Sequence, residues 1–411
     1  MVQKADGWWD KPERFWRCTI TQTLTKSRPT NAQPDSSTRN PNVIVEPRPI
    51  TRLSSLDAFR GVAALAVVLI HVSSHALGNL EGLENLGNPE ARFAVVIFNR
   101  ASQFAVPAFL FLTALVTMRS SLKTNHGTLG FYRSKLKRVL VPYLIWSGLY
   151  GLFRVLTTEL TLTDLQNPER WRDWLLGGDA YYHLYYLVVA LEFYAIFPLV
   201  RRWGLLPVAP ALAGLIGLQI AAYWLNRTVI QGVAPGSSVL NYLVPLGLGL
   251  MVGARLEAWF GSWQRWRLAL VALTALAMVL YLPDAVLALE GVPVDTFAHA
   301  AATWFYTGAC ALLLLGTCMS LNEHLRGRSS GMGVFGFIGQ QSLQVYLIHP
   351  AVIVVLSAAI GGSTRFVPIL STQTPEFWIK EIAILFTAVL VPLVLAWMLE
   401  GSKLSRCLFG R

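Results

Sequence analysis

Charged residues are scarce in this sequence. Only 14% of its 411 residues are charged, 54% are hydrophobic, and the mean hydropathy is +0.47. An average soluble domain has about 25% charged residues. A water-soluble fold of this length rarely tolerates so little charge, and apolar segments are spread along the chain. The composition therefore argues against two or three soluble domains and for one membrane bundle.

Cysteine is also scarce, and the four that occur do not have the spacing of metal ligands: Cys18, Cys310, Cys318 and Cys407. Two of them fall in predicted helices and two in the terminal segments. This pattern predicts neither a disulfide framework nor a zinc site, and we expect no bound metal.

The first 50 residues lack the apolar stretch of about 7–15 residues that a cleavable signal peptide needs. They are polar and rich in proline. We expect residues 1–50 to form a disordered cytoplasmic tail. Contact of the tryptophan and phenylalanine side chains of this tail with the membrane surface is the alternative.

The net charge of +11 does not come from one basic domain. The basic residues lie in short loops between apolar segments, so we expect no nucleic-acid partner. With the N-terminus inside, the inner segments after the tail contain 16 Lys and Arg residues and the outer ones 5. This asymmetry predicts that both termini are cytoplasmic, in an integral, multi-pass protein of the plasma (inner) membrane.

Ten segments after the tail come near the ~20 apolar residues that a helix needs to cross a bilayer. We therefore predict an all-α fold, a polytopic bundle of about ten transmembrane helices over residues 51–402, with a short cytoplasmic tail at 403–411. The expected spans are 54–75, 93–118, 139–156, 182–200, 205–225, 238–257, 268–288, 300–320, 334–360 and 378–400.

The first expected span carries four ionisable residues. Asp57 and Arg60 are three residues apart and can pair on one helix face. Arg60 and His71 are eleven residues apart, close to three full turns, so they share a face about 16 Å apart along the axis, and His75 follows one turn later. An arginine inside a membrane costs at least ~2.5 kcal/mol and must meet a partner or a wet cavity. The plainer interpretation is a structural Asp57–Arg60 pair with an incidental His71.

Further motifs follow in order along the chain. They are FAVPAFLFLTAL at 104–115, Lys135-Leu-Lys-Arg138 before Pro142-Tyr143, His183-Leu-Tyr-Tyr-Leu before Glu192, and SLQVYLIHP at 342–350. With Arg60, ten intervening residues and His71, these segments resemble the signature segments of the acyltransferase-3 family, over residues 53–400. Thr113-Ala114 stands where the family usually has Ser-Gly, and a lysine replaces the more usual first arginine of the basic pair.

The resemblance implies an integral membrane acyltransferase that modifies extracytoplasmic glycans and related molecules. It implies acyl-CoA as the co-substrate, with acetyl-CoA the default, and a hydroxyl group as the acceptor. Such a transfer needs a base for the hydroxyl and positive charge near the developing oxyanion. His71 is expected either to be that base or to carry the acyl group. Arg60 is expected either to hold or polarise the cofactor-side group or only to hold the helix by pairing with Asp57.

Lys135, Lys137 and Arg138 end the second inner loop. They are expected to bind the phosphates of CoA arriving from the cytoplasm. The alternative is that they only anchor the topology of the bundle.

His183 and Glu192 are nine residues apart, so a straight helix would place them on roughly opposite faces. Both are candidate catalytic residues, and for Glu192 we expect a basic partner from another span. His349 is a supporting site member, with a helix break at Pro350 as the plainer account.

Two other functions fit the same composition. A proton-coupled secondary transporter would also place His, Glu and Arg inside the membrane. It would more often show paired broken helices in matching halves, which the prolines do not indicate. A membrane scaffold explains the spans but gives no reason for Arg60 and His71 to share a face.

Overall fold

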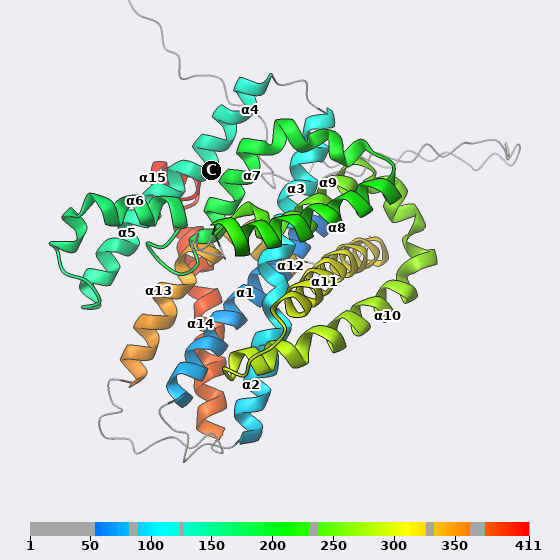
Figure 1. Cartoon of the computed structure of the whole chain (residues 1–411). Coiled ribbons are helices and arrows are strands. Elements are labelled where there is room, and N and C mark those ends of the chain that lie inside the picture. Colours follow the sequence, from blue (N-terminus) through cyan, green and yellow to red (C-terminus); the bar gives the residue numbers. More distant parts are fainter. Residues whose placement is uncertain are drawn as a thin grey trace, which may run out of the picture. The chain divides into compact units, whose positions relative to one another are not determined.

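The computed structural model describes residues 54–81, 89–123, 127–230, 237–325, 333–361 and 375–410. Every regular element within these residues is a helix (Figure 1), which confirms the predicted all-α bundle. The predicted tail over residues 1–50 lies outside the described part of the chain.

The helices follow one another without any strand between them in the described segments. The α-helices are α1 (Ser54–Glu81), α2 (Pro89–Ala101), α3 (Ala105–Lys123), α4 (Thr128–Lys135), α5 (Val141–Leu156), α6 (Pro168–Gly177), α7 (Tyr185–Val200), α8 (Val208–Leu225), α9 (Leu243–Ala254), α10 (Leu256–Leu289), α11 (Thr296–His324), α12 (Gly333–Gln340), α13 (Ser342–Gly361), α14 (Pro375–Met398) and α15 (Lys403–Phe409). The short 3₁₀ or π turns are η1 (Ser102–Phe104), η2 (Leu136–Leu140), η3 (Asp164–Gln166), η4 (Arg201–Leu205), η5 (Asn226–Ile230) and η6 (Val239–Tyr242).

Eight helical segments of the described chain are long and apolar enough to cross a membrane. They are Ser54–Leu77, Arg92–Lys123, Thr128–Leu156, Val208–Val229, Leu256–Leu289, Thr296–His324, Ser342–Ala359 and Phe377–Met398. The remaining two expected spans, 182–200 and 238–257, correspond to the shorter helices α7 and α9. The 16 residues of α7 extend only about 24 Å, less than the ~30 Å hydrocarbon thickness.

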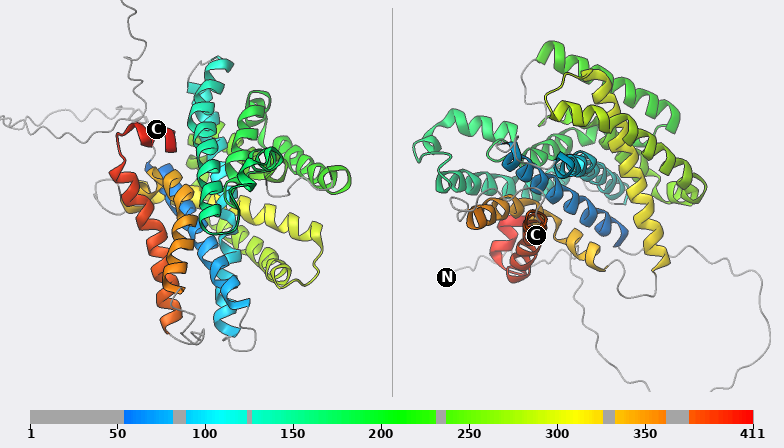
Figure 2. Two further views of the ribbon diagram at one scale, coloured as in Figure 1. Left: turned by 90° about the vertical axis from the view of Figure 1, so that its left-hand side faces the viewer. Right: turned by 90° about the horizontal axis from the view of Figure 1, so that it is seen from below.

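Helix α1 is the central helix of the bundle, in contact with α2, α3, α11, α12, α13 and α14. Figure 2 shows α1, α13 and α14 running side by side. Glycines allow the closest of these approaches. A Cβ at Gly339 of α12 would lie 1.6 Å from the Asp57 carbonyl oxygen, and one at Gly61 would lie 2.1 Å from that of Phe335. Any side chain at either glycine would therefore push α12 away from the residues that carry the Asp57–Arg60 motif.

Helices α3 and α9 also pack backbone to backbone. The family's usual Ser-Gly is Thr113-Ala114 in this chain, and the glycines stand on the partner helix instead. A Cβ at Gly249 would lie 2.2 Å from the carbonyl oxygen of Phe111, and one at Gly253 would lie 2.6 Å from that of Leu115. The small residues needed for this close packing have thus been supplied by α9.

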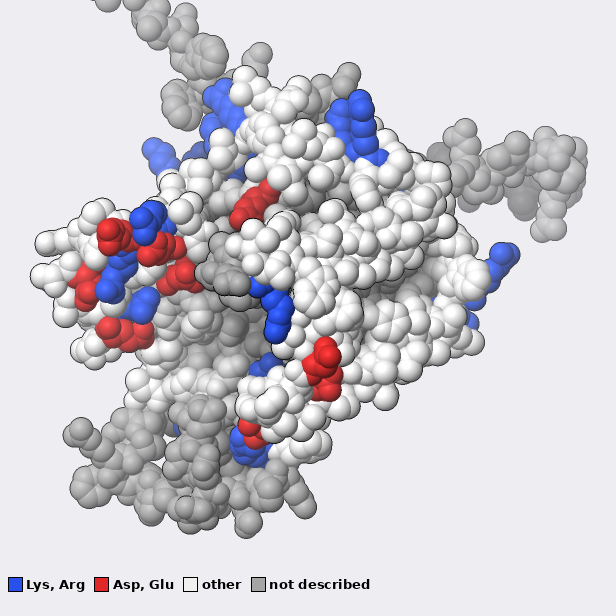
Figure 3. Space-filling view, viewed as in Figure 1, with Lys and Arg blue, Asp and Glu red and all other residues white. Residues whose placement is uncertain are grey.

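Two ion pairs join the α2–α3 segment to α10, one near each end of α10. Arg92 contacts Glu290 at 2.6 Å, and Arg119 contacts Glu257. Figure 3 shows that the viewed face is otherwise largely uncharged, apart from basic residues at the top and a group of mixed charge over α5 and α6. This distribution suits a surface of which most faces lipid.

Residues 403–409 of the predicted short tail form the helix α15. It packs against α5, where Trp146 Nε1 donates to the Leu408 carbonyl at 2.9 Å and the Trp146 and Phe409 rings lie 6.2 Å apart. The cytoplasmic placement of both termini stays a prediction, which follows from the charge asymmetry of the loops.

Candidate active site

Three histidines from distant parts of the chain lie in one cluster. His71 of α1 and His349 of α13 stack with their ring centroids 5.2 Å apart, and His183 meets His349 edge-on at 5.8 Å. The structure thus brings together two predicted catalytic residues, His71 and His183, and a predicted supporting one. We call these three residues the histidine cluster.

The position of His183 depends on a turn and not on a helix. Helix α6 ends at Gly178, whose φ of +80° is a left-handed cap that favours glycine. The chain then turns, and α7 begins only at Tyr185. The prediction that His183 and Glu192 share one straight helix is therefore wrong for His183. Because His183 lies in this turn, the direction of its side chain is not set by the helical repeat of α7, and its imidazole reaches α13.

The nitrogen atoms of the cluster are poorly satisfied by the protein. His349 Nδ1 lies 2.8 Å from the Val345 carbonyl, and a carbonyl only accepts, so in neutral His349 the proton is on Nδ1 and Nε2 is an acceptor. Within the described residues, that Nε2 atom and both ring nitrogens of His183 meet no partner with hydrogen-bond geometry. The Leu347 carbonyl lies beside His183, and it accepts from the Tyr150 hydroxyl at 2.7 Å with one of its two lone pairs. Buried polar atoms without partners are uncommon and mark a place for a ligand, a solvent molecule or a transferred proton.

The three imidazoles differ in how much of their surface is exposed. His183 and His349 are buried, with 1% and 0% of their surface exposed, whereas His71 keeps part of its surface. His71 is accordingly the member of the cluster that a substrate reaches most easily.

Tyrosines surround the histidine cluster, and sequence reasoning missed them. The Tyr182 ring centroid lies 4.7 Å from His71, that of Tyr346 lies 5.2 Å from His183, and that of Tyr150 lies 4.9 Å from His183. The Tyr346 hydroxyl is buried without a partner. Tyr346 stands inside the motif at 342–350, and Tyr182 directly precedes the motif that begins at His183, so their nearness to a histidine in the sequence was the signal available.

A buried asparagine fixes α1 beside the cluster. Asn99 of α2, which is 0% exposed, donates through Nδ2 to the Ile70 carbonyl at 3.0 Å and to the Ser73 and Ser74 hydroxyls at 2.9 Å. These bonds flank His71 in the sequence of α1. The sequence signal for this role was a polar cluster, Asn99-Arg100 with Ser102-Gln103, inside the expected span 93–118.

Arg60 pairs with Asp57 as the spacing predicted. The Nη1–Oδ1 distance is 2.8 Å, and the side chains are 26% and 10% exposed. The guanidinium also lies near Tyr186, whose hydroxyl is 3.2 Å from the Thr113 hydroxyl. Tyr186 packs 5.4 Å from Tyr346, which leads to His183. A column of aromatic rings thus connects Arg60 with the histidine cluster.

Glu192 has a different partner from the expected one. Its Oε2 accepts from the backbone N–H of Val239 at 2.6 Å, at the start of η6. The prediction of a basic partner from another span is wrong, because a free N–H in the first turn of a helix also stabilises a carboxylate. Glu192 therefore ties α7 to η6 and contacts none of the three imidazoles among the described interactions.

Replacement of Glu192 should destabilise the bundle through this single bond. We expect Glu192→Ala to lower the free energy of unfolding by about 1–2 kcal/mol and Glu192→Gln by less, because the amide oxygen still accepts. Thermal unfolding of the purified protein in nanodiscs measures the difference. An alanine variant as stable as the wild type would show that the bond contributes nothing.

The three predicted CoA-binding residues differ in their surroundings. Lys135 is half-buried, with Nζ 4.4 Å from the ring centroid of Tyr194 and 5.6 Å from that of Phe131. Lys137 and Arg138 are exposed on η2, a π-helical turn between α4 and α5. Such turns occur often at functional sites. The side chains of Lys137 and Arg138 can thus bind an anion, while the ammonium group of Lys135 lies over two aromatic rings.

His75 lies one turn beyond His71 on α1, half-buried and near Lys380 of α14. It makes no ring contact with the histidine cluster among the contacts that the structure describes. No group of three or more His, Cys, Asp or Glu side chains in the described segments is arranged to hold a metal ion. A buried carboxylate that the sequence analysis did not single out, Glu381 of α14, is 7% exposed and has an Oε2 atom without a partner.

Fold and cluster together define a multi-pass membrane protein that holds proton-transfer groups inside its bundle. The family comparison is more specific: the model of the acyltransferase domain of the acyltransferase-3 family matches residues 53–400, most of the chain. The chain belongs to this family, and the resemblance of its motifs is confirmed. It is a membrane acyltransferase. Searches of curated proteins and of solved structures find no match.

Proposed function

We propose that this protein moves an acyl group, acetyl by default, from cytoplasmic acyl-CoA to a hydroxyl group of an extracytoplasmic glycan or related acceptor. The observation that carries the proposal is the histidine cluster, in which a partly exposed His71 stacks on His349 beside unpartnered ring nitrogens. The predicted topology places this cluster in the outer half of the first span, on the side of the acceptor. The plasma (inner) membrane is the proposed location.

His71 is proposed to start the reaction. As a base it removes the proton from the acceptor hydroxyl, the oxygen attacks the thioester carbonyl, and the C–S bond breaks to release CoA. As a carrier it attacks the thioester itself and then gives the acyl group to the hydroxyl. In the base route His71 passes this proton to the leaving thiolate, so that CoA departs as the thiol. In the carrier route the acylated imidazole loses its proton, which the lone pair on His349 Nε2, next to the His71 ring, can accept before the thiolate takes it up.

Arg60 is proposed to act on the donor side. It lies about 16 Å nearer than His71 to the predicted cytoplasmic end of α1. Asp57 is its single ion-pair partner among the described residues and takes only part of the five N–H donors of the guanidinium. At this distance from His71 the guanidinium cannot reach the reacting carbonyl, so its proposed part is to hold an anionic group of the donor, such as a phosphate of CoA.

Lys137 and Arg138 are proposed to hold the phosphates of CoA. We expect Lys137→Ala/Arg138→Ala to raise the KM for acyl-CoA by on the order of tenfold or more, because each charge-assisted bond contributes about 1.5–3 kcal/mol when buried and less when exposed. The KM for the acceptor should change little. Initial rates over a grid of both substrates separate the two constants, and a larger effect on the acceptor would contradict the assignment.

The proposed function is tested with purified protein in nanodiscs and acyl-CoA labelled in the acyl group. Release of CoA with transfer of the label to an added hydroxyl compound supports it. Proton-coupled uptake of a solute into vesicles, without loss of the thioester, would support a transporter instead. Mass analysis of surface glycans with and without the protein then identifies the acceptor.

A further inference from the structure

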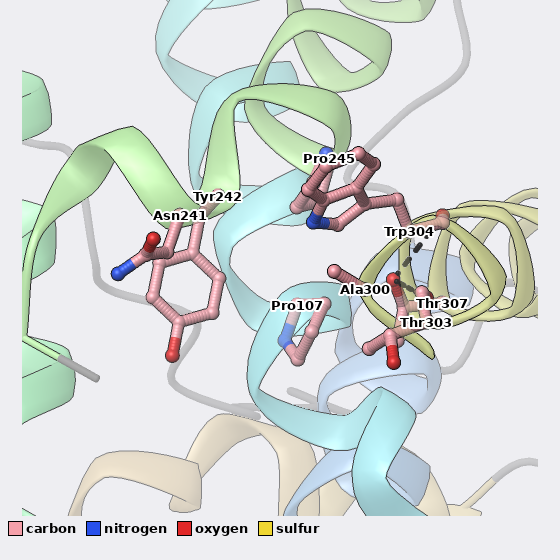
Figure 4. Close-up of a pocket in the computed structure, with 8 residues that line it drawn as sticks. All are labelled: Pro107, Asn241, Tyr242, Pro245, Ala300, Thr303, Trp304 and Thr307. Atoms are coloured by element: carbon pink, nitrogen blue, oxygen red, sulfur yellow. Dashed lines mark hydrogen bonds between the residues drawn. The ribbon is translucent and has the colours of Figure 1, made fainter. Parts of the chain in front are cut away.

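A pocket of about 220 Å³ opens between α3, η6–α9 and α11, away from the residues discussed so far. Figure 4 shows Tyr242 on one side of it and Trp304 on the other, with Pro107 between them. Asn241, Thr303 and Thr307 also line it. Its volume lies below the ~300–1,000 Å³ of sites for drug-sized ligands, so it suits a single small ring.

The pocket lies near the predicted outer surface. Trp304 belongs to an aromatic group at the outer ends of α8 and α11, with ring centroids 5.9 Å from Tyr223 and 6.4 Å from Phe297. Close by, Arg227 Nη1 donates to the Thr296 hydroxyl at 2.7 Å. Aromatic rings with an arginine beyond them are typical of the interface between hydrocarbon and water. A ligand from the outer side therefore needs only a short path to Trp304.

The two threonines of the pocket present acceptors, while the Asn241 amide, the Tyr242 hydroxyl and the Trp304 indole also carry N–H or O–H groups. Thr303 donates its hydroxyl to the His299 carbonyl at 2.7 Å, and Thr307 donates to the Thr303 carbonyl at 2.8 Å, so both oxygens offer only lone pairs to a ligand. Pro107 and Pro245 have no N–H, so neither supplies the usual helical donor to the carbonyl four residues earlier. A matching ligand brings hydroxyl donors together with a flat apolar face for the aromatic rings.

Tyrosines lead from the pocket to the histidine cluster. Tyr242 interacts with Tyr185 and lies near Tyr346, the ring of which is 5.2 Å from that of His183. The backbone bond from Val239 to Glu192 holds this side of the pocket in place, because η6 carries both Val239 and Tyr242. A ring bound between Tyr242 and Trp304 would thus be separated from His183 by two side chains, those of Tyr242 and Tyr346.

We propose that this pocket binds one pyranose ring of the acceptor. This assignment rests on the proposed function, because the ring belongs to the molecule that is to be acylated. The recognition itself is independent of catalysis. The binding of a simple glycoside can therefore be tested without turnover.

The test measures accessibility of a cysteine inside the pocket. Thr303→Cys is introduced into a full-length chain whose four native cysteines are replaced by alanine, and its labelling by a polar maleimide is followed in nanodiscs. Methyl β-D-glucopyranoside at about three times its Kd should slow labelling about fourfold, because only the empty quarter of the pockets reacts. Mannitol, which has the hydroxyls but no ring, should protect far less.

The matched pair of variants is Trp304→Ala and Trp224→Ala. Trp224 packs on the same neighbours, with ring centroids 5.4 Å from Tyr223 and 6.0 Å from Phe297, but does not line the pocket. In the Thr303→Cys background, Trp304→Ala should raise the Kd of the glucoside by on the order of fivefold, and Trp224→Ala should leave this Kd unchanged. Ala298→Cys, exposed on the same helix, serves as the unprotected control position.

Several results would overturn the proposal. One is that Thr303→Cys is not labelled although Ala298→Cys reacts. Another is that mannitol protects as well as the glucoside. A third is protection by decanol but not by the glucoside, which would indicate a groove for a lipid chain. Release of CoA from acyl-CoA by the wild-type protein is measured in parallel. Protection without CoA release would contradict the proposed function alone, and CoA release without protection would contradict this pocket alone.

Discussion

Replacement of His71 by alanine should lower acyl transfer by ~10³-fold, the range expected for loss of a positioned base. Insertion and folding should persist, because His71 is half-buried and the bonds that fix α1 at this level come from Asn99. Initial rates of CoA release and acyl transfer in nanodiscs measure the loss. Size-exclusion chromatography and thermal unfolding confirm that the bundle is intact.

The control for this variant is His75→Ala. His75 lies one turn further along the same helix and makes no described ring contact with the cluster, so its loss should change the rate by only a few-fold. Incubation with labelled acyl-CoA without acceptor separates the two routes, since only an acyl carrier retains label on His71. Normal transfer by His71→Ala would remove this residue from the mechanism.

Replacement of Arg60 by glutamine should have the second-largest effect. We expect a loss of transfer on the order of 10²-fold at subsaturating acyl-CoA, because a charge that holds an anionic group of the donor is removed. Asp57, with only 10% of its side chain exposed, would also be left without its partner. This should cost about 1–2 kcal/mol of stability, less than for a fully buried pair because Arg60 is 26% exposed.

A second substitution distinguishes structure from chemistry at this pair. In Asp57→Asn/Arg60→Gln no unpaired charge remains, so stability should return toward the wild-type value. Transfer should stay low if Arg60 acts on the donor. Recovery of both stability and transfer in the double variant would show that the pair only holds α1 in place.

The membrane fold was predictable because hydropathy is a property of continuous segments. Nine of the ten expected spans correspond to a helical segment in the structure, since about 20 apolar residues leave few alternatives in lipid, while the expected span 334–360 is divided at Gln341 into α12 and α13. The helices α7 and α9 are shorter than expected because their apolar segments include turns, before Tyr185 and at η6. Such turns depend on packing with other helices and leave little trace in a hydropathy average.

The candidate site was predictable only in part. The Asp57–Arg60 pair follows from helical spacing alone, and the structure contains it. The meeting of His71, His183 and His349 depends on how three separate elements pack, which no spacing within one helix encodes. For the same reason Glu192 was given the wrong partner: an N–H at the start of η6 leaves no mark in the side-chain sequence.

The two ion pairs at the ends of the α2–α3 segment and α10 restrict how the bundle can open. A piston-like slide of α10 by one helical turn, about 5.4 Å, would break Arg92–Glu290 and Arg119–Glu257 at once. Bending leaves both in place, and α10 contains Pro283 between them, where a helix bends easily. Any opening motion on this side of the protein should therefore be a bend of α10 at Pro283, with the ion pairs near its two ends kept intact.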